Sequence, residues 1–265
     1  MSGADPRPHA RPATDAAARD RWPPPRAVPF GRVGSVVPLG FGAYRSALHP
    51  ALRFDGDRRE AVSWADVVAE LGREITHPDD WRDLDGDLVR VVDQVPDEGR
   101  LPREVAEPLI EVLHDATTTP TRWWIGVWDG YGSISGGGAR IPLGQRTRWA
   151  RRRARRAAGR WRRERDSYAR WAGSAALIDD WSDGARRFRL FRGGPDAVLA
   201  FGDRGEGPNL WWPDDGAWCV ATDVDLPWTY VGASASTIDE LERRTWLELR
   251  HVTPDEDVAE VRPPS

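Results

Sequence analysis

Between Pro208 and Gly232 the chain reads PNLWWPDDGAWCVATDVDLPWTYVG, which places four tryptophans, one tyrosine and four aspartates in 25 residues. Aromatic side chains bury large areas and pair with defined geometry. We therefore expect this segment to contribute much of the hydrophobic core. Within it, AWCVATDVD and WTYVGA alternate as strands do, and Leu226 and Pro227 mark the turn between them.

Two helices are predicted upstream of this segment. SWADVVAELG has apolar residues at helical spacing, and Ser63 is placed to cap its first turn. EPLIEVLHDAT follows the same spacing, and we start it near Glu107 because Pro108 is best tolerated in a first turn. The capping pattern Thr237-x-x-Glu240 predicts a third helix late in the chain.

The remaining elements are predicted to be strands. TRWWIGVWD alternates from Thr121 to Asp129, and RRFRLFRGG and AVLAFGD predict a hairpin that turns at residues 193–196. WLELRHV, from Trp246 to Val252, predicts a last strand. This order predicts an α+β fold: an antiparallel sheet with packed helices, interrupted by an Arg-rich helical insert.

Composition divides the chain into a body and two ends. Residues 1–27 are rich in Pro, Ala and Arg and predict a disordered tail, and residues 253–265 predict an acidic tail. Between them we expect a single α+β domain, residues 28–252, with the basic insert at about residues 140–175. The 265-residue chain is long enough for one good-sized core or for two small ones.

The chain shows no sign of export or membrane insertion. Cys219 is the single cysteine, so no disulfide can form within one chain. Residues 1–27 lack the apolar stretch of a secretory signal, and no apolar run reaches about 18 residues. A cytoplasmic protein without a transmembrane segment is expected, and the oligomeric state stays open.

The basic residues are concentrated in one segment. Residues 146–170 hold 12 arginines and two acids, a net charge of +10, so the other 240 residues of this −4 chain sum to −14. The segment could pack against the chain's own acidic surface or stay solvated, bind nucleic acid or another polyanion, or contact an anionic membrane or acidic protein. The arginines predicted to contact a polyanion are Arg151, Arg152, Arg153, Arg155, Arg156, Arg160, Arg162 and Arg163.

The Trp-rich segment offers two further hypotheses. Asp223 and Asp225 would be neighbours on one strand face, where they could hold a metal ion or act as acid and base, or pair with arginines. The aromatic residues could pack the core or line a partly exposed binding surface. That surface would consist of Trp124, Trp128, Tyr131, Trp211, Trp212, Trp228 and Tyr230.

Known catalytic motifs are absent. The sequence contains no G-x-S-x-G elbow, no P-loop and no complete dinucleotide fingerprint, and the five histidines are scattered. We therefore predict no catalytic residue and no cofactor.

Several segments together carry a resemblance. These are AYRSALHPA, VSWADVVAELGR, GRLPREVAEPLIEVL, TPTRWWIGVWDGYG and the Trp-rich segment. They resemble an actinobacterial protein family, which implies a bacterial cytoplasmic setting and supplies no site residues. GRLPREVAEPLIEVL followed by a Trp-rich strand is also similar to the SUKH (SMI1/KNR4-type) superfamily, whose α+β modules bind other proteins and often act as toxin-immunity partners.

The function predicted first is a non-catalytic protein-interaction module with an unidentified protein partner, for which the SUKH resemblance implies an immunity-like role. The alternative is nucleic-acid or polyanion binding through residues 146–170. The third is a metal-dependent hydrolase built on Asp223, Asp225 and His251.

Overall fold

The computed structural model describes residues 5–14, 28–73, 76–77, 80–81, 91–132, 134, 163–179 and 186–259. It has the predicted α+β fold, an antiparallel sheet with packed helices. None of the helices in these ranges is long and apolar enough to cross a membrane.

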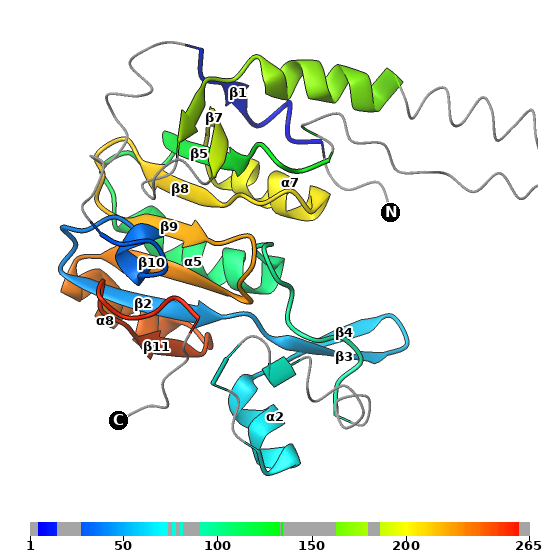
Figure 1. The fold of residues 1–265 in the computed structure, drawn as a ribbon, viewed down its shortest axis with the longest axis vertical. Coiled ribbons are helices and arrows are strands. Elements are labelled where there is room, and N and C mark those ends of the chain that lie inside the picture. The colour runs from blue at the N-terminus through cyan, green and yellow to red at the C-terminus, as the bar shows by residue number, and fades with distance from the viewer. Residues whose placement is uncertain are drawn as a thin grey trace, which may run out of the picture.

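Nine of the described strands form one sheet in the order β1-β7-β5-β8-β9-β10-β2-β11, with β6 also paired to β7. All of these pairs are antiparallel. Figure 1 shows the strands following one another from β1 and β7 at one end to β11 at the other. The strands are β1 (Arg11–Pro12), β2 (Ala43–Leu48), β5 (Trp123–Trp128), β6 (Leu177–Asp179), β7 (Arg187–Gly193), β8 (Leu210–Pro213), β9 (Cys219–Thr222), β10 (Trp228–Ala233) and β11 (Leu249–His251).

One face of the sheet, called here the helix face, is covered by α5 (Arg103–Asp115), α7 (Pro195–Arg204), α8 (Ala235–Arg244) and the helical residues 163–173. Every second residue of a strand points toward the helices on this face, as the alternation of β5 predicts. The core cluster on this face includes Trp123, Ile125, Val127, Leu109, Tyr168, Phe201, Trp211, Trp218, Val220 and Leu241.

The opposite face, called here the loop face, is covered mainly by irregular chain. Residues 28–41, with the short helix η1 (Val33–Ser35), lie over it together with residues 252–258 and α2 (Trp64–Leu71). The hairpin of β3 (Ala51–Asp55) and β4 (Arg58–Val62) projects from the body beside α2 (Figure 1). The loop-face cluster includes Val33, Val37, Trp64, Trp81, Trp124, Leu210, Trp212, Trp228, Tyr230 and Val252.

Three predicted elements differ from the structure. Residues 195–204 form helix α7 and not the second strand of a hairpin, because Pro195 occupies the first turn and Ala197, Val198 and Phe201 bury one helical face. Helix α5 begins at Arg103, so that Pro108 lies inside it. Helix α8 is capped by Ser234, whose hydroxyl accepts the N–H of Thr237.

Both predicted tails are wrong in part. Residues 5–14 include strand β1, and Ala10 and Ala13 are buried. Residues 253–259 pack on the chain as well, since the N–H of Val33 donates to the carbonyl of Glu256 at 2.9 Å. In each case the composition of the segment alone predicts disorder, but a few backbone hydrogen bonds hold it against a distant strand or loop. The remaining tail residues lie outside the described ranges.

Candidate functional site

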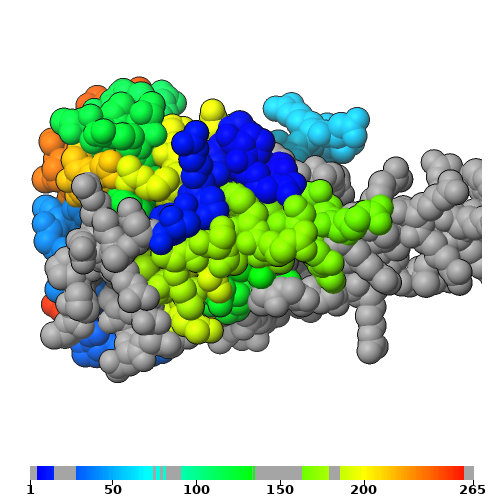
Figure 2. Space-filling view, turned by 90° about the horizontal axis from the view of Figure 1, so that it is seen from above, coloured from blue at the N-terminus to red at the C-terminus, as the bar shows by residue number. Residues whose placement is uncertain are grey.

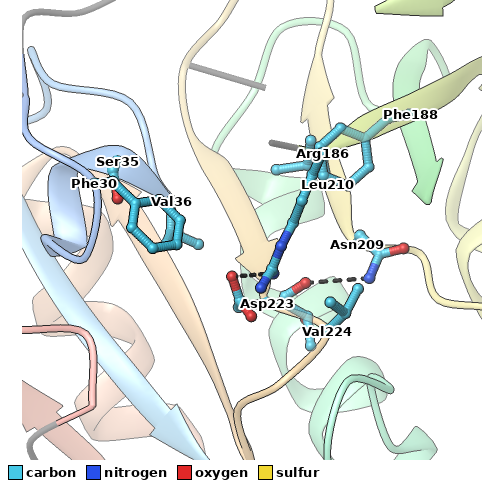
Figure 3. Close-up of a pocket in the computed structure, with 10 residues that line it drawn as sticks. Phe30, Ser35, Val36, Arg186, Phe188, Asn209, Leu210, Asp223 and Val224 are labelled. Carbon is cyan, nitrogen blue, oxygen red and sulfur yellow. Dashed lines mark hydrogen bonds and ion pairs between the residues drawn. The ribbon is translucent and has the colours of Figure 1, made fainter. Parts of the chain in front are cut away.

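A narrow cleft opens on the loop face between residues 30–36 and the strands β7, β8 and β9. Figure 3 shows Phe30, Ser35 and Val36 on one side and Arg186, Phe188, Leu210 and Asn209 on the other. The cleft encloses about 30 Å³, enough for one or two water molecules and too little for a small-molecule substrate. Its lining is completed by Thr222, Asp223 and Val224.

One arginine forms ion pairs with both aspartates that were predicted from the sequence as a candidate site. Strand β9 ends at Thr222, so Asp223 and Asp225 lie in the following turn, where the N–H of Asp225 donates to Asp223 Oδ1 at 2.9 Å. Arg186, just before β7, pairs with Asp223 through one terminal nitrogen and with Asp225 through the other at 2.6 Å. The pair of carboxylates therefore neutralises a guanidinium, which is one of the roles weighed for it from the sequence.

The hydrolase hypothesis finds no constellation in the described residues. No group of three or more His, Cys, Asp or Glu side chains there could hold a metal ion. His251 lies on β11, separated from β9 by β10 and β2, and three strand spacings amount to about 14 Å. The structure therefore does not bring His251 to Asp223 and Asp225.

Asn209 joins the strands beneath the cleft. Its Oδ1 accepts the N–H of Trp128 at 2.9 Å, and its Nδ2 donates to the Tyr131 hydroxyl and to the Thr222 carbonyl, both at 3.2 Å. Burial raises the pKa of Tyr131, whose hydroxyl donates to the carbonyl of Gly99 at 2.7 Å. All side-chain hydrogen-bonding groups of Asn209 are thus used within the protein, which fits a structural role.

A buried polar chain runs from the cleft to His49. The carbonyl of Asp97 can only accept, so His49 Nδ1, at 2.6 Å from it, carries a proton. Burial lowers the pKa of His49 to about 4, which leaves the ring neutral near pH 7. His49 Nε2 then accepts from the Thr229 hydroxyl at 2.9 Å, and Thr229 accepts from Thr222 at 2.8 Å. Sequence spacing gave no signal for this chain, because it joins residues from three separate segments.

The aromatic residues predicted to form a binding surface are mostly buried. Trp124, Trp211, Trp212, Trp228 and Tyr230 each expose 5% or less, and Trp128 and Tyr131 are half-buried. The alternation of the strands sends some rings to the helix face and others to the loop face, and both faces are covered. An exposed surface built from these seven residues is therefore not what the structure shows.

These rings pack against one another in two groups. On the helix face, Trp123, Trp211 and Trp218 lie with ring centroids 5.0–5.5 Å apart, and Trp218 Nε1 donates to the carbonyl of Leu113 at 2.8 Å. On the loop face, Trp124 stacks on Trp212. The guanidinium of Arg192 lies 4.1 Å from a Trp124 ring centroid and pairs with Asp214.

Most of the predicted polyanion contacts lie outside the described residues. This applies to Arg151, Arg152, Arg153, Arg155, Arg156, Arg160 and Arg162. Arg163 is described and exposed, at the start of the helical residues 163–173. The end of the predicted insert is not an appendage, since Tyr168, Ala172 and Ala175 are buried in the helix-face core.

An apolar strip beside the cleft was not predicted from the sequence. Phe30 exposes 68% of its surface and Leu39 46%, and both belong to the segment that covers the loop face. Side-chain atoms of Leu39 and Val28 each lie 3.2 Å from the point that a Cβ on Gly34 would occupy, so the two side chains adjoin. The only signal in the sequence was an aromatic residue between Pro29 and Gly31, a position typical of an exposed turn.

Comparison with protein-family models, with curated proteins and with solved structures finds no match. The resemblances to an actinobacterial family and to the SUKH superfamily therefore stay predictions.

Proposed function

We propose that this protein is a non-catalytic interaction module that binds another protein through the cleft on its loop face. The observation that carries the proposal is the exposed Phe30 beside the Arg186–Asp223 ion pair, with Val28, Val36 and Leu39 extending the apolar strip.

The chemistry of this surface fits a protein partner better than a small molecule. Aromatic and arginine side chains dominate the binding energy of protein interfaces. The cleft is too small to enclose a metabolite, whereas a flat partner needs only an exposed apolar strip with a charged border. Arg186 and Asp223 expose 17% and 15% of their side chains, so a partner that covers them would exclude water from the ion pair, which raises both its Coulomb attraction and the cost of desolvating the two charges.

A photo-crosslinker tests the proposal. In one variant of the full-length protein, expressed in its native cells, a benzophenone amino acid replaces Phe30. In a second variant the same amino acid replaces Phe54. Phe54 is 45% exposed on the projecting hairpin, does not line the cleft, and serves as the matched control. We expect one defined protein adduct at position 30 and none of that size at position 54.

A substitution on the exposed apolar strip tests whether the adduct at position 30 depends on this surface. Leu39→Arg should reduce the adduct at least tenfold, because an exposed apolar contact is replaced by a charge. Identical adduct patterns at positions 30 and 54, or no effect of Leu39→Arg, would contradict the proposal.

Polyanion binding is the alternative, and its support is the charge asymmetry of residues 146–170. If arginines of this segment neutralise phosphates, the affinity for single-stranded nucleic acid falls linearly on a log–log plot against salt concentration. Neutralising six of them should flatten that slope by about 4, at roughly 0.7 per contact for single strands. No binding at 50 mM salt would reject this alternative.

A further inference from the structure

The N-terminal residues 5–14, called here the arm, lie in a groove at the end of the sheet. Arg11 and Pro12 pair with Arg192 and Phe191 of β7, and the N–H of Ala13 donates to the carbonyl of Leu190 at 2.9 Å. On its other side the arm accepts a hydrogen bond, from the N–H of Ala176 to the carbonyl of Ala13 at 2.6 Å. Figure 2 shows the arm, in blue, lying across the yellow-green surface that includes residues 163–173 and β7.

Charge complementarity anchors the start of the arm. Arg7 donates to Ser167 Oγ at 3.1 Å and pairs with the carboxylate of Glu164, both on the helical residues 163–173. Asp5 accepts from the same guanidinium at 2.7 Å. A ligand of this groove is therefore a turn that carries an arginine, followed by a short extended segment, with small side chains, Ala10 and Ala13, at its buried positions.

Several features make this attachment weak for a sheet strand. The strand is two residues long, and Pro12 has no N–H to donate. Arg11 lies directly opposite Arg192, and like charges in that position repel. The buried anchors are alanines, which remove little apolar area from water.

The connection to the body is long. Residues 15–27 join the arm to Val28 and lie outside the described ranges. Thirteen residues can span up to roughly 45 Å when extended. A second copy presents the same Glu164, Ser167 and β7 edge to an arm on such a connection.

We propose that the arm is an exchangeable strand, and that the groove between β7 and residues 163–173 binds the arm of a second copy of this chain. Exchange preserves every contact described above, because the donor and acceptor sequences are the same. When the arm leaves, the β7 edge is open to another strand at Phe191 and Arg192, while β6 still pairs with Arg187 to Arg189, and when a proline-bearing arm sits there the edge is closed to further chains.

Two full-length single-cysteine variants, one arm donor and one acceptor, test this directly. One copy carries Arg11→Cys and the other Arg192→Cys, both in a Cys219→Ala background. In an antiparallel pair these residues lie about 5.5 Å apart at Cα, within the range for a disulfide. Since neither copy has both cysteines, a disulfide between positions 11 and 192 requires exchange. The control acceptor is Arg243→Cys, whose side chain is 69% exposed on α8.

We expect a covalent heterodimer with the Arg192→Cys acceptor at a yield at least tenfold above the control. Adding Arg7→Glu to the donor should lower that yield, and adding Glu164→Arg to the acceptor should restore it, which no random collision would do. A yield equal to the control at all protein concentrations would overturn the proposal, and so would a yield indifferent to the charge swap.

Discussion

At the scale of single residues, the tryptophans of residues 208–232 act through packing and through indole hydrogen bonds, among them those from Trp218 to the carbonyl of Leu113 and from Trp228 to the hydroxyl of Tyr230. Trp218 is fully buried, its ring contacts Trp123 and Trp211 edge to face, and its Nε1 satisfies the carbonyl of Leu113 near the end of α5. It therefore ties β9 to a helix more than one hundred residues earlier in the chain.

Trp218→Phe should lower the free energy of unfolding by about 3 kcal/mol, because it leaves a cavity and strands the carbonyl of Leu113. Trp246→Phe is the matched control, since that ring is 56% exposed, and it should change stability by about 0.5 kcal/mol or less. Urea unfolding of both variants measures this. Equal losses in the two would show that Trp218 does not hold the core together.

His49 gives stability a defined dependence on pH. Its pKa is about 4 in the folded protein and 6.5 when unfolded, so the unfolded chain binds the proton first. The stability that the neutral ring contributes is complete above pH 6.5 and is lost as the pH falls toward 4, by about 3 kcal/mol in total.

His49→Asn keeps a donor for the carbonyl of Asp97 and removes the titrating ring. The variant is destabilised at pH 7.5. Between pH 7.5 and 4.5, however, its free energy of unfolding should fall less than that of the wild type, and the difference between the two falls should be about 2 to 3 kcal/mol. Parallel pH profiles for the two proteins would mean that His49 is not a buried neutral ring.

At the scale of elements, the turn that carries Asp223 depends on a neighbouring loop. Gly99 has φ 70°, its N–H donates to the carbonyl of Leu226, and a Cβ there would lie 2.2 Å from the carbonyl oxygen of Val224. The loop and the turn can approach only because residue 99 has no side chain.

Gly99→Ala should therefore lower the free energy of unfolding by more than about 3 kcal/mol, because the added Cβ both clashes with the backbone and strains it. Gly56→Ala is the control: its φ is 58°, yet nothing lies within 4 Å of the added Cβ, so only the left-handed backbone cost of about 1 kcal/mol remains. Similar melting temperatures for the two variants would contradict the contact with Val224.

Elements with strong local signals were predicted well from the sequence. Ser63 caps α2 as expected, and β5 alternates between the two faces as expected. By contrast, β2, β3 and β4 were not predicted, since their mixed polar and apolar residues gain strand structure only from neighbours in the sheet, and β8 was not predicted because its four residues, LWWP, are all apolar and show no alternation.

The site was less predictable than the fold. Asp223 and Asp225 were found, but their arginine partner comes from a segment 37 positions earlier than Asp223, and ion pairs over such separations leave no periodic signal. Phe30 was missed because exposure is a property of the folded surface. Burial of the aromatic residues on both faces likewise depends on which segments cover the sheet.

At the scale of the whole molecule, the described residues form one body, a sheet packed on both faces. The basic insert ends earlier in the chain than the sequence predicts. The predicted insert reached about residue 175, but Tyr168, Ala172 and Ala175 belong to the helix-face core. An excision that respects the core must therefore end before residue 163.

Thermal unfolding of two deletion variants tests this account most directly. Replacing residues 141–160 by a short Gly-Ser linker should leave a cooperative transition within about 4 °C of the full-length protein, a shift equivalent to roughly 1 kcal/mol. Extending the deletion through residue 175 should abolish the transition, because it removes buried Tyr168 and Ala172. An unfolded first variant, or a second variant that melts like the full-length chain, would contradict the division of the molecule described above.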